Sequence, residues 1–282
     1  MKKLIAIILL TLMALTVSAQ ETIKIVWGFG PMPAYTSASR MVEILNKTQT
    51  EYKFVLDIKA GAGGSLAANH ALQTNSLMLT SNSFIIKGVT ASEKWDDPKN
   101  FSMVYIQSIH TPLVLVSKNY SSIEELLRIG SPNIAVSALG GITDLAAREL
   151  VKNKASIISY KTMYAGLIDT YAGHTDAGIG TWQHVWPFIA NRKVHLLDST
   201  ANHKNMRELQ LEFFIVAPKN YNTKKLVELN QLFNKVGNSD YVREPFSEDK
   251  AEFVHLELTK SESWYLNRQV FWKKYLANIA KN

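Results

Sequence analysis

The sequence of 282 residues contains no cysteine, which excludes disulfide bonds, thiol nucleophiles and cysteine-ligated metals. Its seven histidines are scattered, with no His-Glu-x-x-His run, so neither a metal site nor a cofactor is expected. The Gly-x-Ser-x-Gly turn of many hydrolases is also absent. We therefore assign no catalytic residue and favour binding over catalysis.

Apolar runs long enough to cross a bilayer, about 20 residues, are missing too. The longest run extends from Leu4 to Val17, follows two lysines and ends in small residues. This pattern predicts a secretory signal peptide over residues 1–19, cleaved after Ala19. Because no cysteine follows the run, a lipid anchor is excluded, and we expect a soluble protein of the periplasm.

Clustered basic charge is scarce, although the formal net charge is +7. Beyond the leader, adjacent lysines occur only as the pairs Lys224-Lys225 and Lys273-Lys274. Nucleic-acid binding requires larger basic patches with exposed aromatic residues, so we expect no nucleic-acid partner. A thinly spread positive charge suits small anionic solutes.

The most informative stretch runs from Ser137 to Thr181. Asn133 to Ser137, Ile157 to Tyr160 and Ala177 to Gly180 have the length and flanks of buried parallel strands, and apolar residues recur at helical spacing between them. This order predicts a βαβαβ unit. Ligands of such units bind beyond the carboxyl ends of the strands, where loops lead into helix N-termini.

One loop of this unit has the composition of a small anion-binding turn. Ala138-Leu139-Gly140-Gly141 follows the first strand, and Thr143 is suited to cap the helix that runs to Val151. Amides at a helix start are unpaired and carry partial positive charge. The loop therefore predicts a site for an acidic group.

A second set of elements precedes this unit. Ile23 to Trp27 and Phe54 to Lys59 are predicted strands, with a long loop between them and a helix that resumes near Thr36. Gly61 to Ser65 then turns into a helix, and we interpret it as a tight turn because the third glycine of a dinucleotide fingerprint is missing. Ser81-Asn82-Ser83 follows another short strand and is predicted to be a polar loop facing the same cleft.

Two apolar runs predict a hinge between two lobes. Leu113 to Ser117 and Phe213 to Ala217 are interpreted as the segments that leave and re-enter the first lobe. The first lobe then comprises residues 20–112 plus 218–282, and the second comprises residues 113–217. The predicted fold class is a two-lobed α/β protein with a ligand cleft between the lobes.

Two further features are interpreted as structural. Trp264, Phe271, Trp272 and Tyr275 form an aromatic stripe on a predicted helix, which is typical of a helix docked on a core. His184 has no visible catalytic partner in the sequence and is interpreted as a partly buried histidine with its hydrogen bonds satisfied.

A spaced pattern within the βαβαβ stretch resembles a known family, the solute receptors of the tripartite tricarboxylate transporters, also described from Bordetella uptake proteins (Bug/TctC-like). The pattern joins a Tyr-Lys pair to a Leu-x-Asp and a Gly-x-x-Asp at fixed spacing. Its members here are Tyr160, Lys161, Leu167, Asp169, Gly173 and Asp176. Many fixed positions make it far more specific than a glycine motif.

The resemblance implies a type II-like periplasmic binding protein with a two-strand hinge. Such a receptor is not an enzyme: it binds a small organic anion, a carboxylate, and delivers it to the membrane permease subunits of a tripartite transporter. We expect a monomer. The alternatives are a secreted enzyme on the same scaffold, or a receptor for another permease or a sensor kinase.

The family's first loop is only partly matched. Phe29, Pro31 and Arg40 agree with it, whereas Met32-Pro33 replaces a glycine pair and Thr36 replaces an aspartate. Pro33 has no N–H to offer and Met32 is apolar. The resemblance, read with these substitutions, implies a monocarboxylate, or a dicarboxylate with one end in water, over a tricarboxylate.

Loop patterns and resemblance together indicate the ligand-binding residues. On the first lobe they are Phe29, Tyr35, Thr36, Ser81 and Asn82. On the second lobe they are Ser137, Gly140, Gly141, Ile142, Thr143 and Thr181. We expect a ligand carboxylate at the amides of residues 140–142, with Ser137 and Thr143 as side-chain donors.

Overall fold

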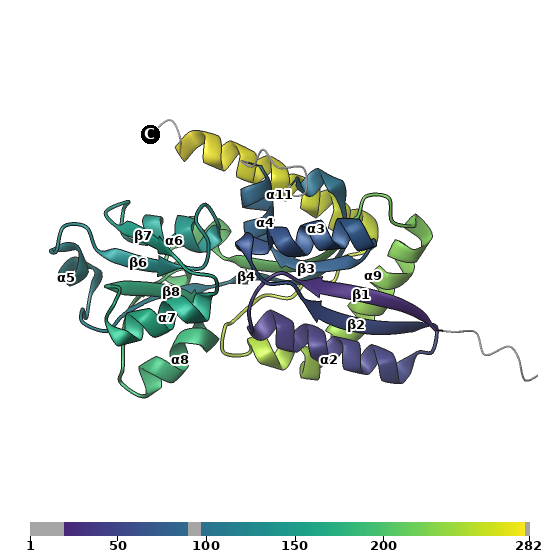
Figure 1. Ribbon diagram of the computed structural model, residues 1–282, viewed down its shortest axis with the longest axis horizontal. Coiled ribbons are helices and arrows are strands. Elements are labelled where there is room, and N and C mark those ends of the chain that lie inside the picture. The colour runs from purple at the N-terminus through teal and green to yellow at the C-terminus, as the bar shows by residue number, and fades with distance from the viewer. Residues whose placement is uncertain (1–19, 90–96, 280–282) are drawn as a thin grey trace, which may run out of the picture.

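The computed structural model describes residues 20–89 and 97–279, which form two five-stranded sheets in two lobes (Figure 1). The two-lobed α/β prediction is confirmed. The predicted leader, residues 1–19, lies outside the described residues. Among the helices that the structure describes, none has the length and apolar character needed to cross a membrane.

The first lobe contains the sheet β2-β1-β3-β10-β4. β1 is parallel to β2 and β3, whereas β10 is antiparallel to β3 and β4. In chain order its elements are β1 (Glu21–Trp27), α2 (Pro33–Thr48), β2 (Tyr52–Ile58), the 3-10 turn Ala62–Gly64, α3 (Ser65–Thr74), β3 (Leu77–Ser81), α4 (Asn82–Gly88), the 3-10 turn Pro98–Asn100, β4 (Phe101–Thr111), β10 (Leu211–Pro218), α9 (Thr223–Gly237), α10 (Asp240–Arg243), the 3-10 turn Glu244–Phe246 and α11 (Leu258–Ile279).

The second lobe contains the sheet β7-β6-β8-β5-β9. β6 is parallel to β7 and β8, and β5 is antiparallel to β8 and β9. Its elements are β5 (Leu113–Ser117), α5 (Ile123–Leu127), β6 (Asn133–Val136), α6 (Ile142–Leu150), β7 (Ser156–Ser159), α7 (Met163–Ala172), β8 (Ala177–Thr181), α8 (Trp182–Ala190) and β9 (His195–Ser199), followed by the 3-10 turns Thr200–Asn202 and Lys204–Leu209.

The βαβαβ unit is confirmed as β6-α6-β7-α7-β8, but one of its strands is not buried. β7 lies at the edge of the sheet, and Ser156 and Ser159 are exposed. Ile158 also reaches solvent, with 38% of its surface exposed. A short apolar run flanked by serines fits an edge strand as well as a central one, and periodicity over four residues does not separate the two.

Three predicted boundaries differ from the structure. α6 begins at Ile142 with Gly141 as its N-cap, so Thr143 lies inside the first turn. α2 begins at Pro33, ahead of the predicted Thr36, because proline at the first helical position has its φ preset and needs no acceptor. Ser81-Asn82-Ser83 is the end of β3 and the start of α4 rather than a loop.

The aromatic stripe of α11 packs onto the first lobe, as predicted. Trp272 is completely buried, and Trp264, Phe271 and Tyr275 are partly buried against the core. The ring of Phe214 in β10 lies 5.6 Å from that of Trp264, edge to face. Burial of an aromatic side chain of this size stabilises the fold by roughly 3 kcal/mol.

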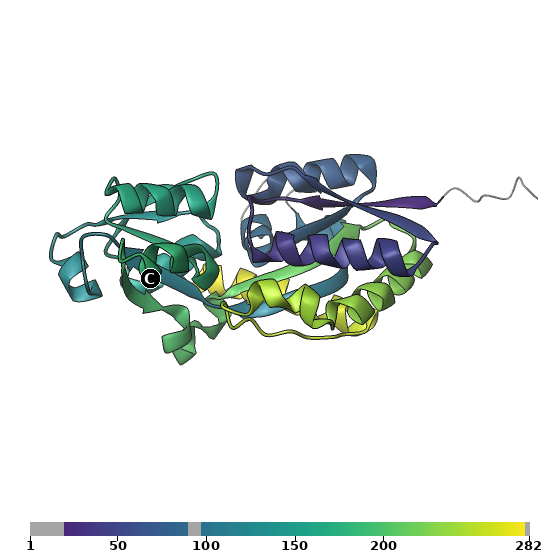
Figure 2. The same cartoon turned by 90° about the horizontal axis from the view of Figure 1, so that it is seen from below.

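Two chain segments connect the lobes, and Figure 2 shows them running between the sheets. The first is Pro112, between the end of β4 and the start of β5. The second is residues 200–210, ahead of β10. The predicted second crossing, Phe213 to Ala217, instead lies inside β10 and pairs with β3 and β4. Every residue of β10 is buried, which explains the apolar run.

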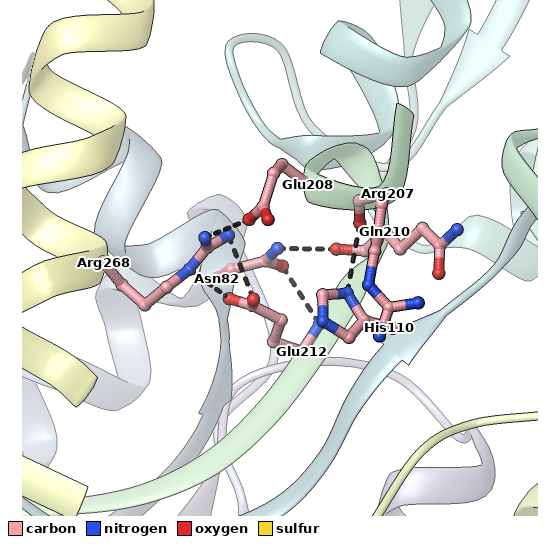
Figure 3. A network of polar contacts seen from close by, with 7 residues as sticks. All are labelled: Asn82, His110, Arg207, Glu208, Gln210, Glu212 and Arg268. Carbon is pink, nitrogen blue, oxygen red and sulfur yellow. Dashed lines mark hydrogen bonds and ion pairs between the residues drawn. The ribbon is translucent and has the colours of Figure 1, made fainter. Parts of the chain in front are cut away.

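A buried polar network fixes the second connection to the first lobe (Figure 3). The guanidinium group of Arg268 in α11 lies between two acids, with Nη2 3.0 Å from Oε1 of Glu212 and Nη1 paired with Glu208. Nδ2 of Asn82 donates to the carbonyl oxygen of Gln210 over 2.8 Å. The chain is therefore held by α4 and α11 as it enters β10.

Candidate functional site

A cavity of about 330 Å³ lies between the lobes and is lined from both. The first lobe contributes the turn before α3 and one residue of α4, and the second contributes the loop after β6 and the end of β7. The lining residues are Ala62, Gly63, Lys87, Ser137, Ala138, Leu139, Ser159, Tyr160 and Lys161. All of them except Lys87, which lies near the end of α4, follow or end parallel strands at their carboxyl ends, where α/β folds bind ligands.

Two lysines and no acid occur among these lining residues. Nζ of Lys87 donates to the carbonyl oxygen of Ala62 over 2.7 Å and to Oγ of Ser65 over 2.5 Å, which orients it at the cavity wall. Lys161 is exposed, and no acid of the described residues forms an ion pair with it. Lys161 therefore brings a positive charge to the cavity wall, which suits an anion.

A smaller chamber of about 30 Å³ adjoins the first, because Ser137 and Lys161 line both. Its walls are mostly apolar and come from the loop after β1 and the start of α7. The lining residues are Phe29, Gly30, Pro31, Met32, Ser137, Lys161, Thr162, Met163, Tyr164 and His184. The ring of Phe29 is held edge to face against Trp27, with centroids 5.2 Å apart.

Glycine is required where the loops of the first lobe approach each other. Gly64 has φ +98°, a conformation that side chains with a Cβ rarely adopt. A Cβ on Gly28 would lie 3.1 Å from Cα of Gly64. The turn before α3 is therefore a structural turn, as predicted, and its close approach brings Gly63 to the cavity.

The lobes touch across the small chamber. A Cβ built on Gly30 would lie 2.8 Å from Cγ2 of Thr162 on the other lobe. Nε2 of His184 lies 3.4 Å from the carbonyl oxygen of Pro31. At these distances the two lobes are in contact with each other at the small chamber.

The amides predicted to hold a carboxylate already have acceptors. The N–H of Gly140 donates to Oδ2 of Asp144 over 2.8 Å, and that of Ile142 donates to Oγ of Ser83 over 3.2 Å. The N–H of Gly141 donates to the carbonyl oxygen of Ala138 over 3.3 Å. None of residues 140–142 lines either cavity.

The two predicted side-chain donors of this loop differ in whether they line the cavities. Ser137 lines both cavities, and its Oγ lies 3.1 Å from Oγ1 of Thr143. Thr143 itself is 1% exposed and lines neither. Thr143 therefore orients Ser137 rather than facing the cavity.

At the start of a second helix of this lobe, α8, a backbone N–H is also bonded to a side chain of the protein itself. The N–H of Gln183 in α8 donates to Oδ1 of Asp249, which follows the turn after α10, over 2.8 Å. Thr181, a predicted ligand residue, is completely buried and pairs through Oγ1 with Nδ1 of His184 over 2.9 Å. Burial lowers the pKa of His184 to about 4, so the imidazole is neutral near pH 7. The interpretation of His184 as buried with its hydrogen bonds satisfied is confirmed.

The other predicted residues of the first lobe do not line the cavities, except Phe29. Asn82 is completely buried and bonds to the chain entering β10. Ser81 is also buried, while Tyr35 packs partly against the core and Thr36 is exposed on α2. The structure thus brings Phe29 and Ser137 together at the cleft and leaves the remaining candidates outside it.

Several lining residues were not predicted. Tyr160 and Lys161 are the first two residues of the spaced family pattern. That pattern is therefore the sequence signal that could have identified them as lining residues. Lys87 had no local signal, because its place at the cleft depends on how α4 packs. Other members of the pattern form the scaffold: the hydroxyl of Tyr160 donates to Oδ2 of Asp169 over 2.6 Å, and Asp176 accepts from the N–H of Asn133 over 2.8 Å.

Two lobes with parallel strands pointing at a shared cleft define the fold of periplasmic solute-binding proteins. Neither a family model nor a curated protein matches the sequence. Among solved structures, a protein described as a periplasmic transporter has a TM-score of 0.77 at 14% identity, covering 93% of this chain and 98% of that one.

Two further solved structures share the fold. The periplasmic binding protein BugD has a TM-score of 0.76 at 15% identity, covering 92% of this chain and 98% of its own. Rpa4515 of R. palustris, solved with adipate, has a TM-score of 0.76 at 17% identity, covering 92% and 96%. The chain therefore has the two-lobed fold of these periplasmic proteins along nearly its whole length.

Proposed function

We propose that the protein is an extracytoplasmic solute receptor that binds a small organic anion, a carboxylate, between its lobes. The observation that carries the proposal is the cavity of about 330 Å³ shared by both lobes, to which Lys161 brings a positive charge with no ion-pair partner among the described residues. An anion placed there contacts both lobes at once and favours their closed arrangement, because ligand binding shifts the equilibrium toward the state it binds best.

The shared fold supports the choice of a carboxylate. Rpa4515, which has this fold, was solved with adipate, a carboxylate. The match between Tyr160-Lys161 and the head of the receptor pattern adds a second, independent support, because Lys161 is one of the two cavity cations. Recognition then depends on side-chain ammonium groups rather than on the amides of the loop after β6.

Calorimetry and a thermal shift on the chain from Gln20 onward test the proposal with a panel of small carboxylates. A receptor gains thermal stability from its ligand in proportion to the logarithm of the ligand concentration. Lys161→Gln should weaken binding at least tenfold, and Lys154→Gln, at an exposed lysine in the connection between α6 and β7, should leave it unchanged. NMR of the solute after long incubation should recover it unaltered; a converted solute would overturn the proposal in favour of an enzyme.

The proposed delivery partner is the membrane permease of a tripartite transporter, and the proposed location is the periplasm. Deleting the gene in the source organism should abolish uptake of the bound solute, and a plasmid copy should restore it. Mass spectrometry of the protein from a periplasmic extract should give a chain beginning at Gln20. Uptake that is unaffected by the deletion would contradict the receptor role.

A further inference from the structure

The helix α7 of the second lobe has apolar residues on two of its sides. Met163 and Leu167 are buried, and the helix packs on β6 and β8. Tyr164, Ile168 and Tyr171 follow the i, i+4, i+7 spacing of a second side. Tyr164 is 51% exposed and Ile168 is 42% exposed. The second apolar side of α7 therefore reaches solvent.

The neighbouring helix extends this side into a surface patch. α7 and α8 lie side by side (Figure 1). The ring centroid of Phe188 in α8 lies 6.2 Å from that of Tyr164 and 5.7 Å from that of Tyr171. We call Tyr164, Ile168, Tyr171 and Phe188 the α7/α8 patch. Because Tyr164 also lines the small chamber of the cleft, the patch begins at the cleft.

Two lysines lie over one ring of the α7/α8 patch. The Nζ atoms of Lys193 and Lys118 are 4.7 Å and 5.7 Å from the ring centroid of Tyr171, and both side chains are exposed. No acid among the described residues forms an ion pair with either lysine. The acid of α7, Asp169, accepts a hydrogen bond from the hydroxyl of Tyr160 instead. The patch therefore combines apolar side chains with positive charge that the described chain does not neutralise.

We propose that the α7/α8 patch docks the membrane permease, through a segment of that partner in which acidic side chains flank apolar ones. The inference rests on the proposed function for the identity of the partner. Carboxylates of such a segment pair with Lys118 and Lys193, while its apolar side chains cover Ile168 and the aromatic rings. Complementary charge steers such an encounter and fixes its register, and buried aromatic residues anchor it.

The charge of the patch argues against a second copy of this chain as the occupant. In a two-fold contact the same patch meets itself, so both copies would bring Lys118 and Lys193 and neither would bring a free acid. An anionic lipid surface would match the lysines as well. A partner that covers Tyr164, however, reaches the edge of the cleft, where solute enters and leaves. This position favours a protein that receives the solute.

Photo-cross-linking in the source organism tests the proposal without any solute. p-Benzoylphenylalanine replaces Ile168 in the full chain, and mass spectrometry identifies the product formed on irradiation. The expected product joins the receptor to a membrane permease subunit. The same replacement at Leu266, an α11 residue that is 58% exposed, is the matched control and should give no such product.

Charge reversal tests the acidic character of the partner. Lys118→Glu/Lys193→Glu should lower the cross-link yield from position 168 by roughly tenfold, because carboxylates then face carboxylates. Lys273→Glu/Lys274→Glu, at two exposed lysines of α11, is the matched control and should leave the yield unchanged. Calorimetry should give both purified variants the wild-type affinity for a carboxylate, because none of the four lysines lines the cleft.

The outcomes separate this inference from the proposed function. A permease cross-link that survives the charge reversal overturns the acidic partner. Cross-links only between copies of this chain, or only to another protein, overturn the docking site. Binding to phosphatidylglycerol vesicles without a permease cross-link overturns it in favour of a lipid surface. Carboxylate binding without a permease cross-link leaves the receptor function standing, and a permease cross-link without carboxylate binding overturns the proposed solute but not the docking site.

Discussion

Asp249 is an acidic side chain buried where the two lobes meet. It is 2% exposed, and its Oδ1 accepts a hydrogen bond from the N–H of Gln183. Burial raises its pKa to about 6, although the neighbouring amides and the hydroxyl of Thr181 act in the opposite direction. At neutral pH the fold therefore holds a carboxylate whose charged form is disfavoured.

Replacing Asp249 with Asn should stabilise the protein at pH 7.5. An acid whose pKa is raised from 3.8 to about 6 on folding binds its proton more tightly when folded, so its contribution to stability falls as pH rises from about 4 to about 6. Asn keeps an acceptor for Gln183 without the charge and removes a penalty of at most about 3 kcal/mol. Urea unfolding at pH 7.5 and pH 4 should show a gain that shrinks toward zero at the lower pH. An equal gain at both values would contradict this assignment.

Arg268 is the residue on which the buried network depends. Glu212, 2% exposed, has a pKa raised to about 7 by burial even though the guanidinium group opposes the shift. Arg268→Leu should cost about 3–5 kcal/mol, because it leaves Glu212 buried without its partner. Urea unfolding of the double variant Arg268→Leu/Glu212→Leu should recover most of that loss. A single variant that unfolds like the wild type would show that the network does not hold the connection.

At the scale of elements, the loop after β1 is in close contact with the start of α7. Gly30→Ala should weaken solute binding without lowering thermal stability, because the added Cβ meets only Thr162 of the opposite lobe. Thr162→Ser removes the offending methyl group and keeps the hydroxyl that caps α7, so the double variant should regain affinity. Calorimetry measures both. Unchanged affinity in Gly30→Ala would mean that the lobes do not close on this contact when they bind solute.

Elements whose buried residues recur at a regular local spacing could be predicted from the sequence. β6, α7 and β8 followed from apolar spacing, and the stripe on α11 from its aromatic residues. β7 and β10 were harder, because a short apolar run does not reveal whether a strand lies at an edge, in the centre or at a crossing. Sheet order depends on pairings between residues far apart in the chain, and local patterns carry little of that information.

The site was less predictable than the fold for the same reason. The glycine loop after β6 has the composition of an anion turn, yet Asp144 and Ser83 occupy two of its amides. Asp144 is close in sequence, but Ser83 comes from the other lobe, so only the docked structure reveals it. Lys87 reaches the cavity for a similar long-range reason, through the packing of α4.

At the scale of the whole molecule, two connections and a shared cleft allow the lobes to move as units. Pro112 forms one connection and residues 200–210 the other, while the network around Arg268 holds the second against the first lobe. Motion is therefore expected about the junctions with the second lobe rather than within β10. The proposed closure on an anion would bring Lys161 of the second lobe and Lys87 of the first lobe to the same solute.

Small-angle X-ray scattering with and without a saturating solute tests the central claim most directly. The account predicts a protein that is more open in the absence of solute, whose radius of gyration falls on binding to the value of the closed arrangement with the lobes in contact. Gly30→Ala should show a smaller fall at the same solute concentration. A scattering curve that stays the same when a calorimetrically confirmed solute saturates the protein would contradict closure of two lobes around an anion.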